Sequence, residues 1–519
     1  MRQIAVVFIF LVIILPSTGK SASQEAIDSL TAKLEAWEVS EAWGEVNRLL
    51  GDEPKDPKLL ELASHIAFHK GDYQEASKLM KQALEQDGKD EKKKAFASFI
   101  EETFVLVSSF KRVESSHFVI SLDEKQDDIL RDYLIDSLEK TYRVMAQQYG
   151  FQPPEKIRIE VFPNAKAFYL VTTLSARDIE VTGAVGIAQF NKLMMLSPRA
   201  LVHGYRWLDA ISHEYMHYLI LKLTKNKAPI WFHEGMAKYE ETRWRNGPSY
   251  LSSFYQTLLA RALSEGKLIR FDQMEPSLVS LENPEDVQLA YAEAASAIEF
   301  ILMKSGYDGL QKVMRQMAIT NQKGAGKAIQ EVLRLPFSEF EDTWKGFLSS
   351  KGYQEIAGVH GHQYKIKEGK YDEDRMDTEE IKSLVAKNKA HLGDLLKERG
   401  RMEAAVLEYR RALEESRDSV TIMKKLSSAL TTMARYEEAL ALLRRAKDIS
   451  SDHPGIFTAL GQIYLKLKRM KEARDSFEET IQINPFDPEA HVGLATAYET
   501  LGERSSASKE REIGRRLMQ

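Results

Sequence analysis

The sequence predicts a mostly helical protein in which an α+β domain lies between two all-α arrays of helical repeats. Three observations support this fold class. Small residues and leucines recur with a fixed step of 34 residues, which is typical of helix pairs that stack on one another. Short β-rich runs lie in the middle of the chain, and a long helical stretch follows them. The length of 519 residues, of which 43% are hydrophobic, suffices for two to four globular domains.

Composition limits the chemistry that the chain can perform. It has no cysteine, which excludes disulfides, thiolate nucleophiles, zinc fingers and iron–sulfur clusters. Any metal site must therefore use His, Asp or Glu. The 72 basic and 77 acidic side chains give a net charge of −5, without the concentrated basic excess of nucleic-acid-binding proteins. We expect no nucleic-acid partner.

The first residues are typical of a secretory signal peptide. Arg2 precedes an unbroken apolar run, residues 4–15, which is followed by Pro16 and a stretch rich in small residues. The run is shorter than the roughly 20 apolar residues that span a bilayer. We expect export with cleavage near residues 19–23, or an uncleaved segment that provides the sole contact with a membrane. An exported chain without cysteine fits a bacterial periplasmic or secreted protein.

The 34-residue step is clearest in the last third of the chain. A small residue is needed where two antiparallel helices cross closely, and a leucine packs beside it. The columns are Ala405, Ala439, Ala473 and Ala507; Gly393, Ser427, Gly461 and Ala495; and Leu392, Leu426, Leu460 and Leu494. These segments resemble tetratricopeptide repeats, best at residues 453–485, and the resemblance implies surfaces that bind protein partners. Ala42 and Ala76 keep the same step, which predicts degenerate repeats near the start.

Between the repeats, the periodicity changes to that of strands. Runs of β-rich sequence bounded by Pro, Gly or Asn lie at residues 117–121, 156–162, 184–190 and 192–196. From about Arg199 to Ser350 the chain is expected to be helical. This order predicts an α+β domain that is distinct from the repeats.

The chemistry concentrates in residues 210–241. His213, Glu214 and His217 form an HExxH motif inside a segment without Gly or Pro, which predicts a helix. Residues four apart lie one turn above each other, so both imidazoles can reach one metal ion. Glu214 lies about 100° around the helix from His213, where it can hold a water on that ion without binding the ion itself.

A second segment, residues 228–239, reads Ala-Pro-Ile-Trp-Phe-His-Glu-Gly-Met-Ala-Lys-Tyr. Together with the HExxH helix it resembles the gluzincin metallopeptidases, specifically the peptidase MA-like domains, over roughly residues 117–348. The resemblance implies a zincin-like α+β fold that binds one Zn²⁺ ion. It also implies the ligands of that ion, which are His213, His217 and Glu234.

Three further expectations come from this resemblance. Gly235 would let its helix approach the HExxH helix closely. Tyr291, on a later helix, would stabilise the oxyanion of the reaction. Some members place an acid four residues after the ligand Glu to orient a ligand His, whereas this chain has Lys238 there. Glu240, Glu241 or a backbone carbonyl would have to take that role.

Two functions are consistent with these features. The first is an exported zinc-dependent endopeptidase in which Glu214 acts as general base and the repeats recruit substrates or partners. Its substrate would be unfolded or flexible polypeptide, because the paired strands at residues 184–190 and 192–196 offer an edge to an extended chain. The alternative is a non-catalytic, metal-binding repeat scaffold for envelope protein complexes.

The sequence divides into five expected parts. These are residues 1–23 for the signal peptide, 24–112 for the N-terminal repeats, 113–351 for the peptidase MA-like domain, 352–385 for a polar linker and 386–519 for a C-terminal array of about four repeats, the last of which caps the array.

Overall fold

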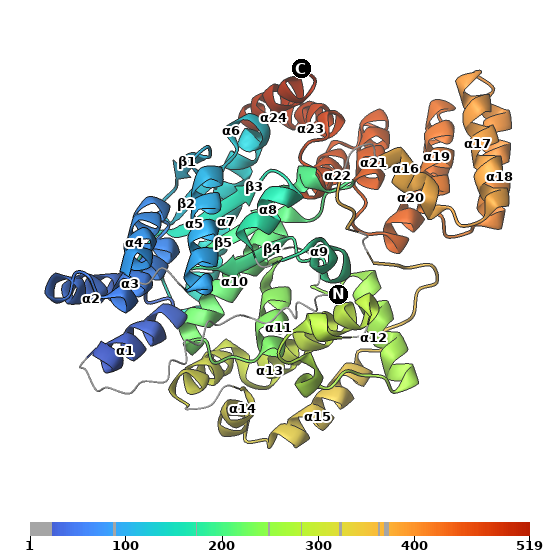
Figure 1. Cartoon of the computed structure of the whole chain (residues 1–519). Helices are drawn as coiled ribbons and strands as arrows, with labels where there is room; N and C mark the ends of the chain where they lie inside the picture. Colours follow the sequence, from blue (N-terminus) through green and yellow to red (C-terminus); the bar gives the residue numbers. More distant parts are fainter. Residues whose placement is uncertain are drawn as a thin grey trace. The chain divides into compact units, whose positions relative to one another are not determined.

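The computed structural model describes residues 23–86, 90–172, 174–245, 247, 250–281, 283–320, 324–361, 364–367 and 373–519. It confirms a mostly helical protein with a mixed sheet (Figure 1). Unit 1 comprises Met1–Leu196, Asp209–Tyr250 and Leu268–Gly352, and unit 2 comprises Ser197–Leu208, Leu251–Lys267 and Tyr353–Gln519. The expected signal peptide, except for Ser23, lies outside the described residues. None of the helices in the described part of the chain is long and apolar enough to cross a membrane.

Five helices open the part of unit 1 that the structure describes. They are α1 (Ser23–Glu35), α2 (Val39–Asp52), α3 (Pro57–Lys70), α4 (Tyr73–Gln86) and α5 (Glu91–Val107). Helix α3 begins where the side chain of Asp56 accepts hydrogen bonds from two backbone N–H groups, and it ends at Gly71, whose φ is +82°. Ala42 and Ala76, the small residues 34 positions apart, are fully buried. The expected helix pairs are therefore present at the start of unit 1.

The sheet of unit 1 has five strands in the order β1-β2-β3-β5-β4. They are β1 (Lys111–Glu114), β2 (Phe118–Leu122), β3 (Ile157–Phe162), β4 (Gly186–Gln189) and β5 (Lys192–Leu196). Strands β2, β3 and β5 run parallel, whereas β1 and β4 run antiparallel to their neighbours. Strands β4 and β5 are joined by Phe190 and Asn191, both with φ of +54°, as in a tight hairpin turn. Strand β4 therefore ends the sheet on one side.

Helices supply the rest of unit 1. They are α6 (Glu124–Asp127), α7 (Arg131–Tyr149), α8 (Ala165–Val171), α9 (Ala176–Thr182), α10 (Trp207–Thr224), α11 (Ile230–Glu240), α13 (Pro284–Ile319), α14 (Gly326–Leu333) and α15 (Phe337–Ser350). Helix α11 packs along α13. A Cβ atom on Gly235 would lie 2.5 Å from the carbonyl oxygen of Ala294. Gly235 therefore lets α11 approach α13 closely. The expectation that Gly235 serves close approach to the HExxH helix is wrong.

Unit 2 contains α12 (Ser253–Glu265) and an array of helix pairs. The array comprises α17 (Leu384–Glu398), α18 (Met402–Glu415), α19 (Val420–Thr432), α20 (Tyr436–Ile449), α21 (Pro454–Lys466), α22 (Met470–Ile483), α23 (Pro488–Leu501) and α24 (Arg504–Leu517). Figure 1 shows these helices following one another in orange and red. A Cβ atom on Gly461 would lie 2.7 Å from the ring of Phe477, so a small residue is needed at this crossing. The segment expected to be a linker contains a short helix, α16 (Glu373–Glu380).

The residues that lead into α10 belong to unit 2. The guanidinium of Arg206 donates to Asp452 at 2.6 Å and to Glu479 at 2.7 Å. The indole N–H of Trp207 donates to the carbonyl of Ile481 at 3.0 Å. Trp207, which belongs to unit 2, is therefore hydrogen-bonded to the C-terminal repeats of the same unit.

Candidate metal centre

Helices α10 and α11 bring the three predicted ligands together. The Nε2 atom of His213 lies 3.4 Å from Glu234 Oε2, and the Nε2 atom of His217 lies 3.5 Å from the same oxygen. Ligands bound tetrahedrally at about 2.0–2.1 Å lie roughly 3.3 Å apart. These separations fit a zinc ion bound by two imidazoles and one carboxylate. The turn between α10 and α11 reverses the direction of the chain and brings Glu234 back to the two histidines. In this turn Lys225 and Asn226 have φ of +52° and +57°.

The charges of the cluster complement one another. Burial alone would raise the pKa of Glu234, but His217 and His213 hold it well below its ordinary value. Burial alone would lower the pKa of His213, but hydrogen bonds with Glu234 and Glu241 raise it to about 10. The cluster thus stabilises positive charge beside the carboxylate, as a cation site requires.

Glu241 takes the place of the missing acid at position 238. Its Oε2 atom lies 3.3 Å from Nδ1 of His213, while Lys238 donates to its Oε1 atom at 2.5 Å. An acceptor at Nδ1 places the proton there and leaves Nε2 as a metal ligand. Of the alternatives considered from the sequence, Glu241 therefore has the right position. Glu240 instead accepts hydrogen bonds from the hydroxyls of Tyr149 and Tyr307.

Glu214 lies beside the ligands and beneath strand β4. Its side chain is buried, and the backbone N–H of Ala188 donates to its carboxylate. Burial raises its pKa, and the charges of His217 and His213 act in the opposite direction. A Cβ atom on Gly186 would lie 2.7 Å from Cγ of Glu214, so only glycine leaves room for this carboxylate.

Tyr291 approaches the cluster from α13. Its ring centroid lies 6.4 Å from that of His213. His233 is a neighbour that sequence reasoning did not single out, with its ring 5.7 Å from that of His217. Gly186 and the amide of Ala188 were also missed. A glycine inside a strand is a recognised sign of close approach by another group, so Gly186 could have been found.

A second group of two histidines and one acid lies in unit 2. Nε2 atoms of His203 and His453 each lie 3.6 Å from Asp377 Oδ1. However, the ammonium of Lys424 lies 3.0 Å from His453 Nε2 and 2.9 Å from Asp377 Oδ2. In addition, Nδ1 of His453 accepts from the N–H of Gly455, whereas a metal-binding imidazole usually donates from its other nitrogen. This group has the residue types of a metal site but not its surroundings.

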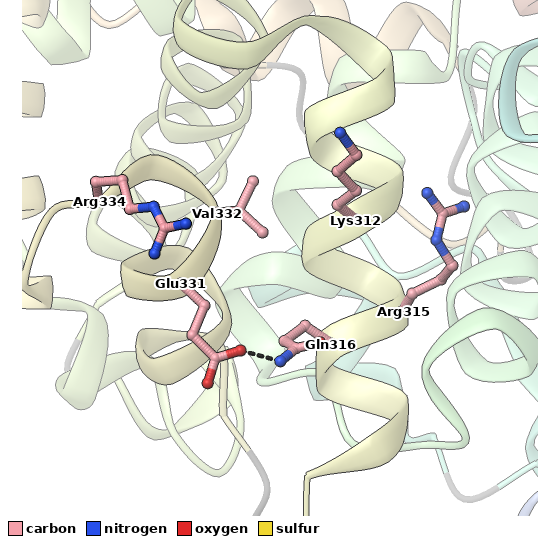
Figure 2. Close-up of a pocket in the computed structure, with 6 residues that line it drawn as sticks. All are labelled: Lys312, Arg315, Gln316, Glu331, Val332 and Arg334. Carbon is pink, nitrogen blue, oxygen red and sulfur yellow. Dashed lines mark hydrogen bonds between the residues drawn. The ribbon is translucent and has the colours of Figure 1, made fainter.

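A polar pocket of about 480 Å³ lies between α13 and α14 (Figure 2). It is lined by Lys312, Arg315, Gln316, Glu331, Val332 and Arg334. Glu331 accepts a hydrogen bond from Gln316. Figure 2 shows Lys312 and Arg315 pointing to different sides of α13, so the cations do not converge. The pocket contains none of the predicted metal ligands.

Known families match several segments of the chain. Residues 139–350 match the model described as the Peptidase MA superfamily. This range includes the HExxH helix and Glu234. This segment of the chain is therefore similar to Peptidase MA superfamily domains. Residues 57–90 match a tetratricopeptide repeat, and residues 398–480 match the family described as anaphase-promoting complex, cyclosome, subunit 3.

Individual proteins that resemble this chain match about a quarter of its length. The chain is 26% identical over 140 residues to the protein CTR9 homolog of Arabidopsis thaliana, and this match spans 26% of the chain but 12% of that protein. The solved structure of MamA is 22% identical, covering 26% of this chain and 81% of MamA, with a TM-score of 0.24. A thermophilic TPR protein of Thermus thermophilus is 22% identical, covering 25% of this chain and 74% of that protein, with a TM-score of 0.24.

Proposed function

We propose that this protein is an exported zinc endopeptidase that cleaves extended polypeptides. The observation that carries the proposal is the convergence of His213 and His217 on one oxygen of Glu234, with Glu214 beside them. A zinc ion held by these residues would polarise the scissile carbonyl and lower the pKa of the attacking water.

The side chains around the ligands divide the remaining work. Glu214 takes the proton from the attacking water and passes it to the leaving amine. Tyr291 is the candidate donor to the oxyanion, since its ring lies next to that of His213. Glu241 orients His213 through the Nδ1 atom of its ring, while the Nε2 atom faces Glu234. These roles assign one proton carrier, one hydrogen-bond donor and one positioning residue.

The substrate class follows from strand β4 (Gly186–Gln189). This strand ends the sheet, and its residue Ala188 donates to Glu214. A peptide that adds to this edge in extended form places its backbone beside the catalytic carboxylate. Unfolded or flexible polypeptides can adopt this form, and the tetratricopeptide repeats would recruit them or protein partners.

Export is supported by Arg2, the apolar run at residues 4–15 and the small residues that follow. The active protein would then work in the periplasm or outside the cell. N-terminal sequencing of the purified protein checks this, with a mature end near residues 19–23 as the expected result. A retained Met1 on a cytoplasmic protein would contradict it.

The test of catalysis compares wild type with Glu214→Gln. Both proteins are incubated with an unfolded protein, with and without a chelator, and the products are identified by mass. Glu214→Gln should keep its zinc but cleave about 10³-fold more slowly, because it removes the general base. Glu339→Gln, at an exposed position on α15, is the matched control and should behave as wild type. Equal cleavage by wild type and Glu214→Gln would overturn the proposal, and zinc binding without cleavage in either would favour the non-catalytic scaffold.

A further inference from the structure

We propose that the repeat formed by α3 and α4 holds strand β4 in place, and that Phe190 and Lys192 are the positioning residues through which it does so. Phe190 lies in the turn of the hairpin that β4 and β5 form, and Lys192 is the first residue of β5. The same hairpin carries Gly186 and Ala188, which lie against the carboxylate of Glu214. The part of the inference that concerns peptide binding rests on the proposed function.

Lys192 joins β5 to the repeat through a buried network of charges. Its side chain is fully buried, and its ammonium donates to the hydroxyl of Tyr73 on α4 at 2.5 Å and to Glu160 on β3 at 2.6 Å. The Tyr73 hydroxyl in turn donates to Glu160 and accepts from Arg158. A buried ammonium needs such partners, because burial without them is costly. Tyr73 therefore ties the first residue of β5 to α4.

The turn between α3 and α4 also contacts strand β3. The guanidinium of Arg158 donates to the carbonyl of His69 at 3.0 Å. A Cβ atom on Gly71 would lie 2.0 Å from Cζ of Arg158, so the guanidinium packs against the bare backbone of this turn. Arg158 is the cross-strand partner of Lys192 in the sheet. The repeat therefore contacts β3 and β5 at the same level of the sheet.

Phe190 adds a contact at the turn of the hairpin. Its ring centroid lies 5.1 Å from that of Phe68, 5.4 Å from that of His69 and 5.9 Å from that of Phe99. Phe68 and His69 belong to α3, and Phe99 belongs to α5. The rings of Phe68 and His69 meet that of Phe190 edge to face, an arrangement that adds attraction beyond the burial of apolar surface. The hairpin turn is therefore packed against the N-terminal helices.

The alternation of side chains connects these contacts with Glu214. Gly186 pairs with Met195, three residues after Lys192. Successive residues of a strand point to opposite faces, so Gly186 faces away from the Lys192 side and toward Glu214. In the part of the sheet that the structure describes, β4 pairs with β5 alone. A loosened hairpin would therefore move Gly186 and the N–H of Ala188 relative to Glu214.

Hydrogen–deuterium exchange measures the hold on β4 without any assay of cleavage. Phe190→Ala removes the ring contacts of the hairpin turn, and Tyr73→Phe removes the hydroxyl on the repeat. In each variant the amides of β4 should exchange about tenfold faster, because local opening becomes easier when such contacts are lost. Phe190 is only half-buried, so its variant should keep the helix content of the wild type by circular dichroism.

The matched control is Phe96→Ala, on α5. Phe96 is half-buried like Phe190, and it contacts the rings of His65, Phe68 and Phe99. None of these three residues belongs to the hairpin. The control should leave the exchange of β4 unchanged. Unchanged exchange in either test variant, or an equal rise in the control, would overturn the proposal.

Cleavage of casein, an unfolded polypeptide, tests the consequence for peptide binding. Phe190→Ala and Tyr73→Phe should each raise KM about tenfold and change kcat much less, because the edge that receives the extended chain is displaced. Glu214→Gln should instead lower kcat. Faster exchange with an unchanged KM would overturn the link to peptide binding. A wild type that leaves casein intact would count against the proposed function, while exchange still decides whether the repeat holds β4.

Discussion

Two clusters of two histidines and one acid occur among the residues that the structure describes, and they differ in what surrounds them. In unit 1, an acceptor lies at the outer nitrogen of His213, and both Nε2 atoms face Glu234. In unit 2, Lys424 lies within 3.0 Å of both His453 and Asp377. The ammonium group already supplies the positive charge that a metal would bring. Residue types alone therefore do not distinguish the two clusters, whereas the groups next to the side chains favour the first as the metal site.

The largest expected effect concerns which histidine controls zinc content. His217→Ala removes one of the three proposed protein ligands and should abolish stoichiometric zinc binding. His453→Ala, in the second cluster, should leave zinc content unchanged. Metal analysis by mass spectrometry after dialysis measures both. Loss of zinc from His453→Ala with retention in His217→Ala would reverse the assignment of the two clusters.

A smaller effect is expected from the residue that orients His213. Glu241→Ala removes the acceptor at Nδ1 and should weaken zinc binding by about 10–100-fold. Lys238→Met should weaken it less, because it removes only the partner that holds Glu241. Competition with a chromophoric chelator measures both affinities without any activity assay. Unchanged affinity in Glu241→Ala would show that the contact with His213 does not orient the ring.

The smallest effect concerns the stability that Lys424 gives to the repeat array. Lys424→Met removes the ammonium group that pairs with Asp377 in a largely buried site and should cost about 1–3 kcal/mol of unfolding free energy at pH 7. Burial would raise the pKa of Asp377, but His453 and Lys424 hold it well below its ordinary value. The carboxylate therefore stabilises the fold fully above its ordinary pKa, and this contribution is lost as pH falls toward the lowered folded value.

Chemical unfolding of wild type and Lys424→Met at several pH values checks this dependence. The difference between the two proteins should be largest near pH 7 and should shrink below about pH 4, where Asp377 begins to be protonated in the unfolded chain. Lys425→Met, which removes the more exposed pair with Asp394, is the control and should change stability by less than about 1 kcal/mol. A difference that grows at low pH would contradict the account of this cluster.

The sequence predicts those features that depend on the spacing of residues along the chain. The HExxH helix follows from residues four apart, and the repeats follow from columns such as Leu426 and Leu460. Strand β1 was not expected, because its sequence Lys-Arg-Val-Glu is polar and alternates between half-buried and exposed. The sequence predicts a linker in place of helix α16, because the residues of this helix are almost all charged or polar. Its place is set by contacts with α19, which are distant in sequence.

The contacts that distinguish the two clusters could not be predicted from local spacing in the sequence. His203, Asp377 and His453 are far apart in the chain and share no motif, so only the fold brings them together. Sequence reasoning also could not choose between Glu240 and Glu241, because neighbouring residues at a helix end point in directions about 100° apart. The packing of Tyr149 and Tyr307 around Glu240 leaves Glu241 to face His213.

Anomalous scattering at the zinc absorption edge, from crystals grown with zinc, tests the difference between the two clusters most directly. The predicted result is one anomalous peak between His213, His217 and Glu234, and none between His203, Asp377 and His453. A peak at the second cluster, or no peak at the first, would contradict the assignment of the metal centre.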